Sequence, residues 1–175
     1  MNSVTVFLLQ AGMSFLVLFL VVRWFVAPYL ATQPIRTVML LLLLPHAAHH
    51  VGLAVLVPGV VGVGFPSNFA WIIAAGEPVM LFLAILSAAT VRTRSSHAVF
   101  WLWIFTVCGF AYNFIAAFVG IQLGSTLVDK LDAHWYVSVF YVPLLAVSHI
   151  LVLINLLKRG RELDPANTQK RTVAA

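Results

Sequence analysis

Three histidines lie close together in a long apolar stretch of this 175-residue chain, at His46, His49 and His50. Ionisable side chains at the depth of a lipid bilayer are costly, so such a cluster usually marks a functional site. If the stretch is an α-helix, the i,i+3 and i,i+4 spacings place all three imidazoles on one face within about one turn. Imidazole can bind zinc, copper, iron or nickel, and it can carry protons near neutral pH.

Glu77 is the one acidic residue inside an apolar stretch. The other four acids lie near the ends of such stretches or in the carboxyl-terminal tail: Asp129, Asp132, Glu162 and Asp164. A buried carboxylate is either neutral or paired with a cation, and no lysine or arginine lies at the same predicted depth. We therefore expect Glu77 to approach at least one of four histidines, namely His46, His49, His50 and His149.

The composition predicts the elements that must position these residues. Hydrophobic residues make up 62% of the chain and charged residues 9%, with a mean hydropathy of +1.03, whereas soluble domains carry about 25% charged residues. About 20 continuous apolar residues cross a bilayer as a helix. The sequence thus predicts an all-α integral membrane bundle with five transmembrane helices, at about residues 4–27, 37–57, 68–90, 97–123 and 133–157.

The boundaries of these spans come from local signals. Pro28 is expected to end the first span, and Ser67 or Asn68 is expected to cap the third. Residues 1–160 would form the bundle, and residues 161–175 would form a polar cytoplasmic tail that is mostly disordered.

Basic residues predict the orientation of the bundle. Nine of the ten lie in the first connection, the third connection or the tail: Arg23, Arg36, Arg92, Arg94, Lys158, Arg159, Arg161, Lys170 and Arg171. The fourth connection has only Lys130. Five spans then place the amino terminus outside and the carboxyl terminus in the cytoplasm, in the inner (cytoplasmic) membrane. The net charge of +5 follows this bias, so the lipid bilayer is expected as a partner and nucleic acid is not.

Four of the predicted helices bring polar residues to a similar depth, at about 1.5 Å of rise per residue. Prolines at positions 45, 78 and 143 accompany them, as is typical where a membrane helix borders a cavity. We expect a mid-bilayer pocket lined by these polar side chains: His46, His49, His50, Glu77, Asn113 and His149.

Three functions fit such a pocket. The first is binding of a small or lipophilic molecule, with ligand contacts from His46, His50, Tyr112, Asn113, Tyr141 and His149. The second is a haem- or metal-binding redox protein that uses His46, His49, His50 and His149 as ligands; axial haem ligation would pair one of the first three with His149. The third is a lipid-modifying enzyme in which Glu77 and His49 transfer protons.

The histidines could also serve only to join helices through hydrogen bonds, so whether the protein is an enzyme, and whether it holds haem or a transition metal, stays open. Cys108 is the only cysteine, which excludes an intrachain disulfide and a multi-cysteine metal site. Ser148 is expected to bond within its own helix. The small residues Ala116, Gly120 and Gly124 are spaced for close helix contact, either within the bundle or in a homo-oligomer.

Several stretches resemble a group of small bacterial multi-pass membrane proteins without an assigned activity. They are His46-Ala47 leading to Gly52-Leu53-Ala54-Val55-Leu56-Val57-Pro58-Gly59-Val60-Val61, Phe65-Pro66 with Phe69-Ala70, and Val142-Pro143-Leu144-Leu145 with His149. They fall within residues 45–90 and 134–160. In that group an arginine commonly stands at the position of His50, and Gly-Asp at Gly76-Glu77. The resemblance implies a cation facing an anion, and it favours a paired polar site over a three-histidine metal cage.

Overall fold

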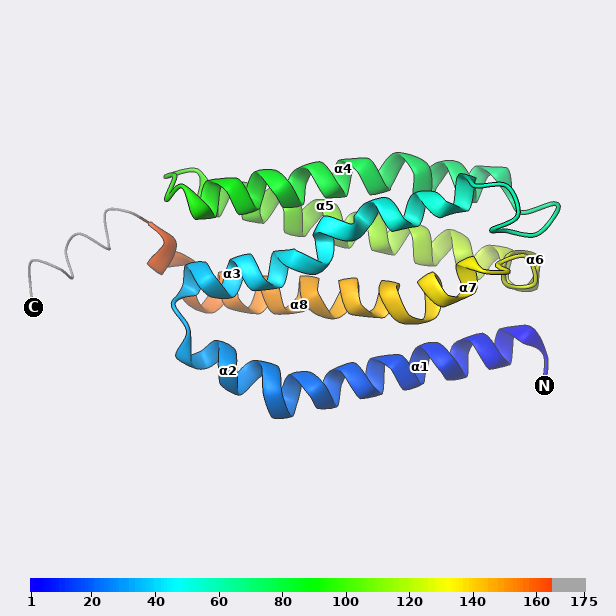
Figure 1. Ribbon diagram of the computed structural model, residues 1–175, viewed down its shortest axis with the longest axis horizontal. Helices are drawn as coiled ribbons and strands as arrows, with labels where there is room; N and C mark the ends of the chain where they lie inside the picture. The colour runs from blue at the N-terminus through cyan, green and yellow to red at the C-terminus, as the bar shows by residue number, and fades with distance from the viewer. Residues whose placement is uncertain (165–175) are drawn as a thin grey trace, which may run out of the picture.

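The computed structural model describes residues 1–164, and this part of the chain is all-helical, with one isolated bridge between Pro58 and Val61 and no strand. Five helical rods lie side by side in a bundle (Figure 1). They run over Ser3–Thr32, Ile35–Leu56, Ser67–Arg92, Ala98–Leu123 and His134–Leu163, and each is long and apolar enough to cross a membrane. The prediction of five apolar helices is confirmed.

The first rod continues past Pro28, so the prediction that this proline ends the helix is wrong. The rod consists of α1 (Ser3–Val21), a π-helical turn η1 (Val22–Val26) and α2 (Ala27–Thr32). A proline ring clashes with the carbonyl four residues earlier and lacks an N–H. The wider π turn, which ends two residues before Pro28, accommodates both effects without a break.

The fifth rod also contains a π-helical turn at the same distance before a proline. It consists of α7 (His134–Tyr136), the π-helical turn η3 (Val137–Tyr141), α8 (Val142–Arg159) and the 3₁₀ turn η4 (Gly160–Leu163). Here too the π turn ends two residues before a proline, Pro143. Turns of this kind are rare and are frequently found at functional sites.

The second rod changes its helical type halfway. An α-helix, α3 (Ile35–Leu43), gives way to a 3₁₀ helix, η2 (Leu44–Leu56), at Pro45. A 3₁₀ helix has three residues per turn. The buried residues of η2 therefore recur at every third position, at His46, His49, Gly52 and Val55.

The third and fourth rods are the uninterrupted helices α4 (Ser67–Arg92) and α5 (Ala98–Leu123). Within the described chain no side chain caps α4, which is entered through Pro66, so the expected cap by Ser67 or Asn68 is not formed. Instead, Asn68 Oδ1 accepts the N–H of the next residue at 2.9 Å. A short helix, α6 (Ser125–Val128), follows α5 and leads to the fifth rod.

The apolar core lies among the second to fifth rods. Its larger cluster includes the fully buried Val38, Met39, Leu102 and Phe105, and a smaller cluster at the other end contains Phe69, Leu127 and Leu131. By contrast, α1 contributes no buried residue; it packs mainly on α8, η3 and α6 (Figure 1). The first rod is thus a peripheral wall of the bundle.

The carboxyl-terminal end of the bundle is tied together by arginines. Arg36 donates to the carbonyls of Val91 at 3.1 Å and of Leu163 at 2.9 Å. Leu163 is buried, so η4 belongs to the bundle, which extends past the predicted boundary at residue 160. The rest of the predicted tail, residues 165–175, lies outside the described residues.

Candidate functional site

Side chains from three rods form a hydrogen-bonded chain near the middle of the bundle. Tyr112 on α5 donates its hydroxyl to Glu77 Oε1 at 2.8 Å. The second carboxylate oxygen, Oε2, lies 2.8 Å from Nδ1 of His49 on η2. His49 Nε2 in turn lies 3.2 Å from Nδ1 of His46. The expectation that Glu77 approaches a histidine is confirmed, and the histidine is His49.

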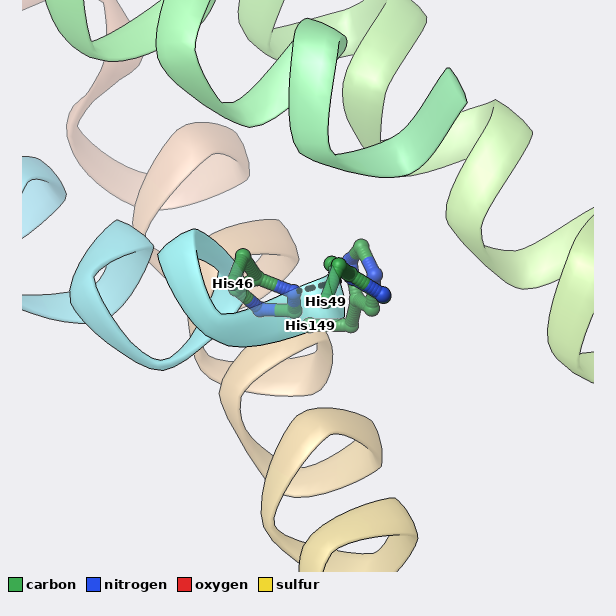
Figure 2. Close-up of side chains that lie close together, drawn as sticks. All are labelled: His46, His49 and His149. Carbon is green, nitrogen blue, oxygen red and sulfur yellow. Dashed lines mark hydrogen bonds between the residues drawn. The ribbon is translucent and has the colours of Figure 1, made fainter. Parts of the chain in front are cut away.

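His149 on α8 joins the two histidines of η2. Its ring centre lies 4.3 Å from that of His46, and it stacks on Phe105 at 4.5 Å with an interplanar angle of 28°. One nitrogen from each of His46, His49 and His149 lies within 4.8 Å of the other two. Figure 2 shows the three rings gathered at one point, two from η2 and one from α8. We call these residues the histidine cluster.

The histidine cluster is fully enclosed. The exposed fractions of His46, His49 and His149 are 0%, 1% and 0%. Within residues 1–164, His46 Nε2 and both ring nitrogens of His149 have no hydrogen-bond partner. Each buried polar atom without a partner costs about 1–3 kcal/mol. Protein groups therefore do not complete the hydrogen bonding of the cluster.

His50 does not belong to this site, and its predicted roles as ligand-binding residue and metal ligand are wrong. The i,i+4 spacing from His46 would align the two residues only in an α-helix. In the 3₁₀ helix the aligned partner is three residues away, so His49 points inward and His50 is exposed. The histidine that contacts Glu77 in this chain is therefore His49, and not the residue at position 50 as the resemblance implied.

Three glycines make room for the site, and none of them was expected from the sequence to do so. A β-carbon on Gly52 would lie 2.4 Å from Cδ of Glu77, and one on Gly76 would lie 2.1 Å from Cε2 of Tyr112. A β-carbon on Gly109 would lie 2.2 Å from Cε1 of His149. Glycine inside a helix is destabilising relative to alanine and often reflects a close approach of another group. That signal was available in the sequence.

Two hydroxyls hold the second rod at its change of helical type. Ser148 donates to the carbonyl of Leu42 at 2.5 Å, and Tyr141 donates to that of Pro45 at 2.8 Å. In a 3₁₀ pattern the carbonyl of Leu42 would accept from residue 45, which is a proline without an N–H. The expectation that Ser148 bonds within its own helix is thus wrong, because a freed carbonyl lies opposite it.

A cavity of about 450 Å³ lies between α1, α4, α5 and the start of the fifth rod. Four of the predicted site residues line it: Glu77, Tyr112, Asn113 and Tyr141. Most other lining side chains are apolar, including Phe7 and Phe15 of α1. Asn113 is anchored by its side-chain amide, which donates to the carbonyl of Gly109 at 2.8 Å.

The histidine cluster does not line this cavity, contrary to the prediction that His46, His49 and His149 face a common pocket. Among the described residues, Glu77, Tyr112 and Gly52 line the cavity on the side of the histidine cluster, and the cluster lies behind them. Glu77 therefore separates two environments, with an apolar cavity on one side and a closed imidazole cluster on the other.

The row of small residues on α5 also lines the cavity. Ala116, Gly120 and Gly124 all face it, and the nearest neighbour of a β-carbon on Gly120 would be Leu127 Cδ2, at 3.6 Å. Their small size widens the space between α5 and α1. Their predicted role in a homo-oligomer stays a prediction.

The arrangement of the cluster does not suit axial haem ligation across the bundle. A porphyrin would have to stand between His149 and one histidine of η2. The rings of His46 and His149 are centred 4.3 Å apart and tilted by 57°, and Phe105 packs against both. The rings are in direct contact, which leaves no space for a macrocycle between them.

The fold and site together define a class: an all-helical protein with five apolar, membrane-length helices around a buried Glu–His cluster and an adjoining apolar cavity. The chain belongs to the family described as a domain of unknown function, DUF8737, whose model matches residues 6–157. This match includes three of the rods in full, most of the first and fifth rods, and every residue of the Glu–His cluster. No curated protein and no solved structure matches the chain.

Proposed function

We propose that this is a multi-pass protein of the inner (cytoplasmic) membrane of a bacterial cell that binds an amphiphilic molecule, with an apolar tail in the cavity and a polar head at Glu77. The observation that carries the proposal is the position of Glu77 at the end of a cavity of about 450 Å³ with mostly apolar walls. This volume lies within the range of ligand pockets, about 300–1,000 Å³, which typically combine apolar walls with a few polar groups.

The chemistry of the cavity end favours a head group that donates hydrogen bonds. Glu77 already accepts from Tyr112 and contacts His49, yet an ionised carboxylate has about four acceptor positions. A hydroxyl or amine head could therefore add to Glu77 without displacing either neighbour. The apolar walls suit one aliphatic or isoprenoid chain.

The peripheral first rod supports entry of such a molecule from the side. Phe7, Ala11 and Phe15 form the α1 wall of the cavity, while α1 has no buried residue of its own. At its amino-terminal end α1 is held by Gln10, which accepts from Trp135 Nε1 at 2.6 Å, and by a hydrogen bond from Ser3 to Asp129. A lipophilic molecule in the bilayer needs only a small outward movement of α1 to reach the cavity.

The test is binding of a fluorescent long-chain alcohol to the detergent-purified protein. Ala116→Phe should fill the cavity and lower the affinity at least tenfold. Ala111→Phe is the matched control, because Ala111 lies on the same helix, is exposed and is not a lining residue. Glu77→Gln should weaken binding several-fold. Equal affinity in Ala116→Phe and Ala111→Phe would contradict the proposal.

A second candidate is a lipid-modifying enzyme, favoured by one observation: Glu77 faces the cavity and is backed by His49 at 2.8 Å. Glu77 would transfer the proton, and His49 would act through it as a positioning residue. An enzyme would lose turnover in Glu77→Gln while keeping ligand affinity, and the wild type would show a bell-shaped pH profile. A binding protein would lose affinity in the same variant.

A further inference from the structure

We propose that His46, His49 and His149 bind one divalent transition-metal ion, with Zn²⁺ as the best-matched ion. This site is separate from the cavity, which none of the three residues lines. It uses neutral imidazole nitrogens, which suit zinc, copper, nickel and iron and do not suit magnesium or calcium. The two sites share one neighbour, Glu77.

The strongest observation is the set of unsatisfied nitrogens. In the described part of the chain, His46 Nε2, His149 Nδ1 and His149 Nε2 are buried and without a partner. Histidines that only joined helices would be expected to use these atoms in hydrogen bonds, because buried polar groups almost always find partners. A bound cation would accept an electron pair from one nitrogen of His149 and so satisfy one of these atoms.

The spacing of the nitrogens fits a tetrahedral ion. Zinc–nitrogen bonds of about 2.0–2.1 Å place two tetrahedral ligand atoms about 3.3 Å apart. His49 Nε2 and His46 Nδ1 lie 3.2 Å apart, so an ion can replace the proton that they now share. One nitrogen from each of the three histidines lies within 4.8 Å of the other two, which requires His149 to move inward by at most about 1.5 Å.

Glu77 holds His49 in the tautomer that a metal needs. The carboxylate lies 2.8 Å from Nδ1, so Nδ1 carries the proton and Nε2 keeps a free electron pair directed at the cluster. A carboxylate behind a ligating histidine is a common arrangement in metal sites, where it fixes the ring and raises its basicity. It also places one negative charge near the buried ion.

The third ligand is held by packing. The ring of His149 stacks on Phe105 at 4.5 Å and lies close against α5 at Gly109. Three nitrogen ligands leave a fourth position open, as in sites where zinc binds a water or a substrate atom.

The experiment is a titration of chelator-treated full-length protein in detergent with Zn²⁺, competed against a chromophoric chelator. We expect one equivalent to bind, with affinity reduced at least 100-fold in His46→Ala or His149→Ala and about 10–100-fold in Glu77→Gln. His50→Ala is the matched control, since His50 follows His49 directly and is exposed; it should bind like the wild type. Elemental analysis of protein purified without chelator identifies zinc, copper or another metal as the native ion.

A second measurement guards against variants that fail to fold. Co²⁺ added to the wild type should give the intense visible bands of a tetrahedral site, and X-ray absorption should show nitrogen neighbours. Absence of stoichiometric binding of Zn²⁺, Cu²⁺, Ni²⁺ and Co²⁺ by the wild type would overturn the proposal. Equal loss of binding in His50→Ala and His149→Ala would overturn it as well. Binding of the fluorescent alcohol is read separately, so failure of either site leaves the other standing.

Discussion

Gly109 on α5 and His149 on α8 lie in such close contact that no side chain fits between them. Replacing Gly109 by alanine would put a β-carbon 2.2 Å from Cε1 and 2.3 Å from Nε2 of His149. The ring would have to leave the cluster or the helices would have to separate, at a cost of about 1–3 kcal/mol. We predict that Gly109→Ala lowers the thermal unfolding temperature in detergent and weakens Zn²⁺ binding at least tenfold.

The control for this substitution is Gly120→Ala on the same helix. There the nearest atom would lie at an ordinary contact distance, 3.6 Å. Alanine in a helix interior is favoured over glycine by up to about 1 kcal/mol, so Gly120→Ala should be neutral or stabilising. If Gly109→Ala is as stable as the wild type and binds Zn²⁺ with the same affinity, the close contact with His149 affects neither stability nor metal binding.

Removing the hydroxyl of Tyr112 tests the link between the cavity and the cluster. Tyr112→Phe deletes one hydrogen bond to Glu77 and leaves the ring in place. Such a bond to an ionised group contributes about 1.5–3 kcal/mol, and buried membrane bonds often contribute less. We expect a several-fold change in affinity for the fluorescent alcohol, while Zn²⁺ affinity changes less than in Glu77→Gln. An unchanged alcohol affinity would show that Tyr112 does not set the head-group site.

Ser148→Ala should destabilise the bundle by about 1–2 kcal/mol. The hydroxyl bonds to the carbonyl of Leu42, which lacks a regular partner because position 45 is proline. The measurement is unfolding in detergent followed by circular dichroism. Thr106→Val is the control: its hydroxyl bonds to the carbonyl of Leu102 in its own helix at 2.7 Å, and that carbonyl keeps its backbone partner. The two variants should therefore differ.

The orientation can be tested with a reporter fused after Ala175. Most basic residues gather at the end of the bundle where η4 docks, with Arg36, Arg94 and Arg159 among them, and the positive-inside bias assigns that end to the cytoplasm. A fluorescent protein or alkaline phosphatase fused after Ala175 should report a cytoplasmic location, and one fused before Met1 an outside location. Labelling of the carboxyl-terminal reporter only from outside would reverse the orientation.

Much of this architecture could be predicted from the sequence, because continuous apolar runs leave few alternatives to membrane-length helices. Glu77 could be matched to a histidine because a lone buried carboxylate needs a partner, and no arginine or lysine lies at its depth. What the sequence could not decide was which histidine. His49 and His50 are neighbours, and only the helical type of residues 44–56 determines which one faces inward.

Two other errors, at Pro28 and at Ser148, share a physical cause, the effect of proline on a helix. At Pro28 the chain widens into a π turn and continues, and at Pro45 it tightens into a 3₁₀ helix. Helix propensities predict that proline breaks a helix. They do not predict whether the helix will widen into a π turn or tighten into a 3₁₀ helix. Ser148 was misassigned for this reason, since its true acceptor exists only after the second rod has changed type.

The 3₁₀ segment also sets the length of the second rod. The second rod has 22 residues, and α4 and α5 have 26 each. An α-helix rises about 1.5 Å per residue and a 3₁₀ helix about 2.0 Å, so all three rods reach about 39 Å. Rewound as an α-helix, the second rod would be about 33 Å long, about 6 Å shorter than its two neighbours. The 3₁₀ helix that turns His49 inward thus also makes the second rod as long as α4 and α5.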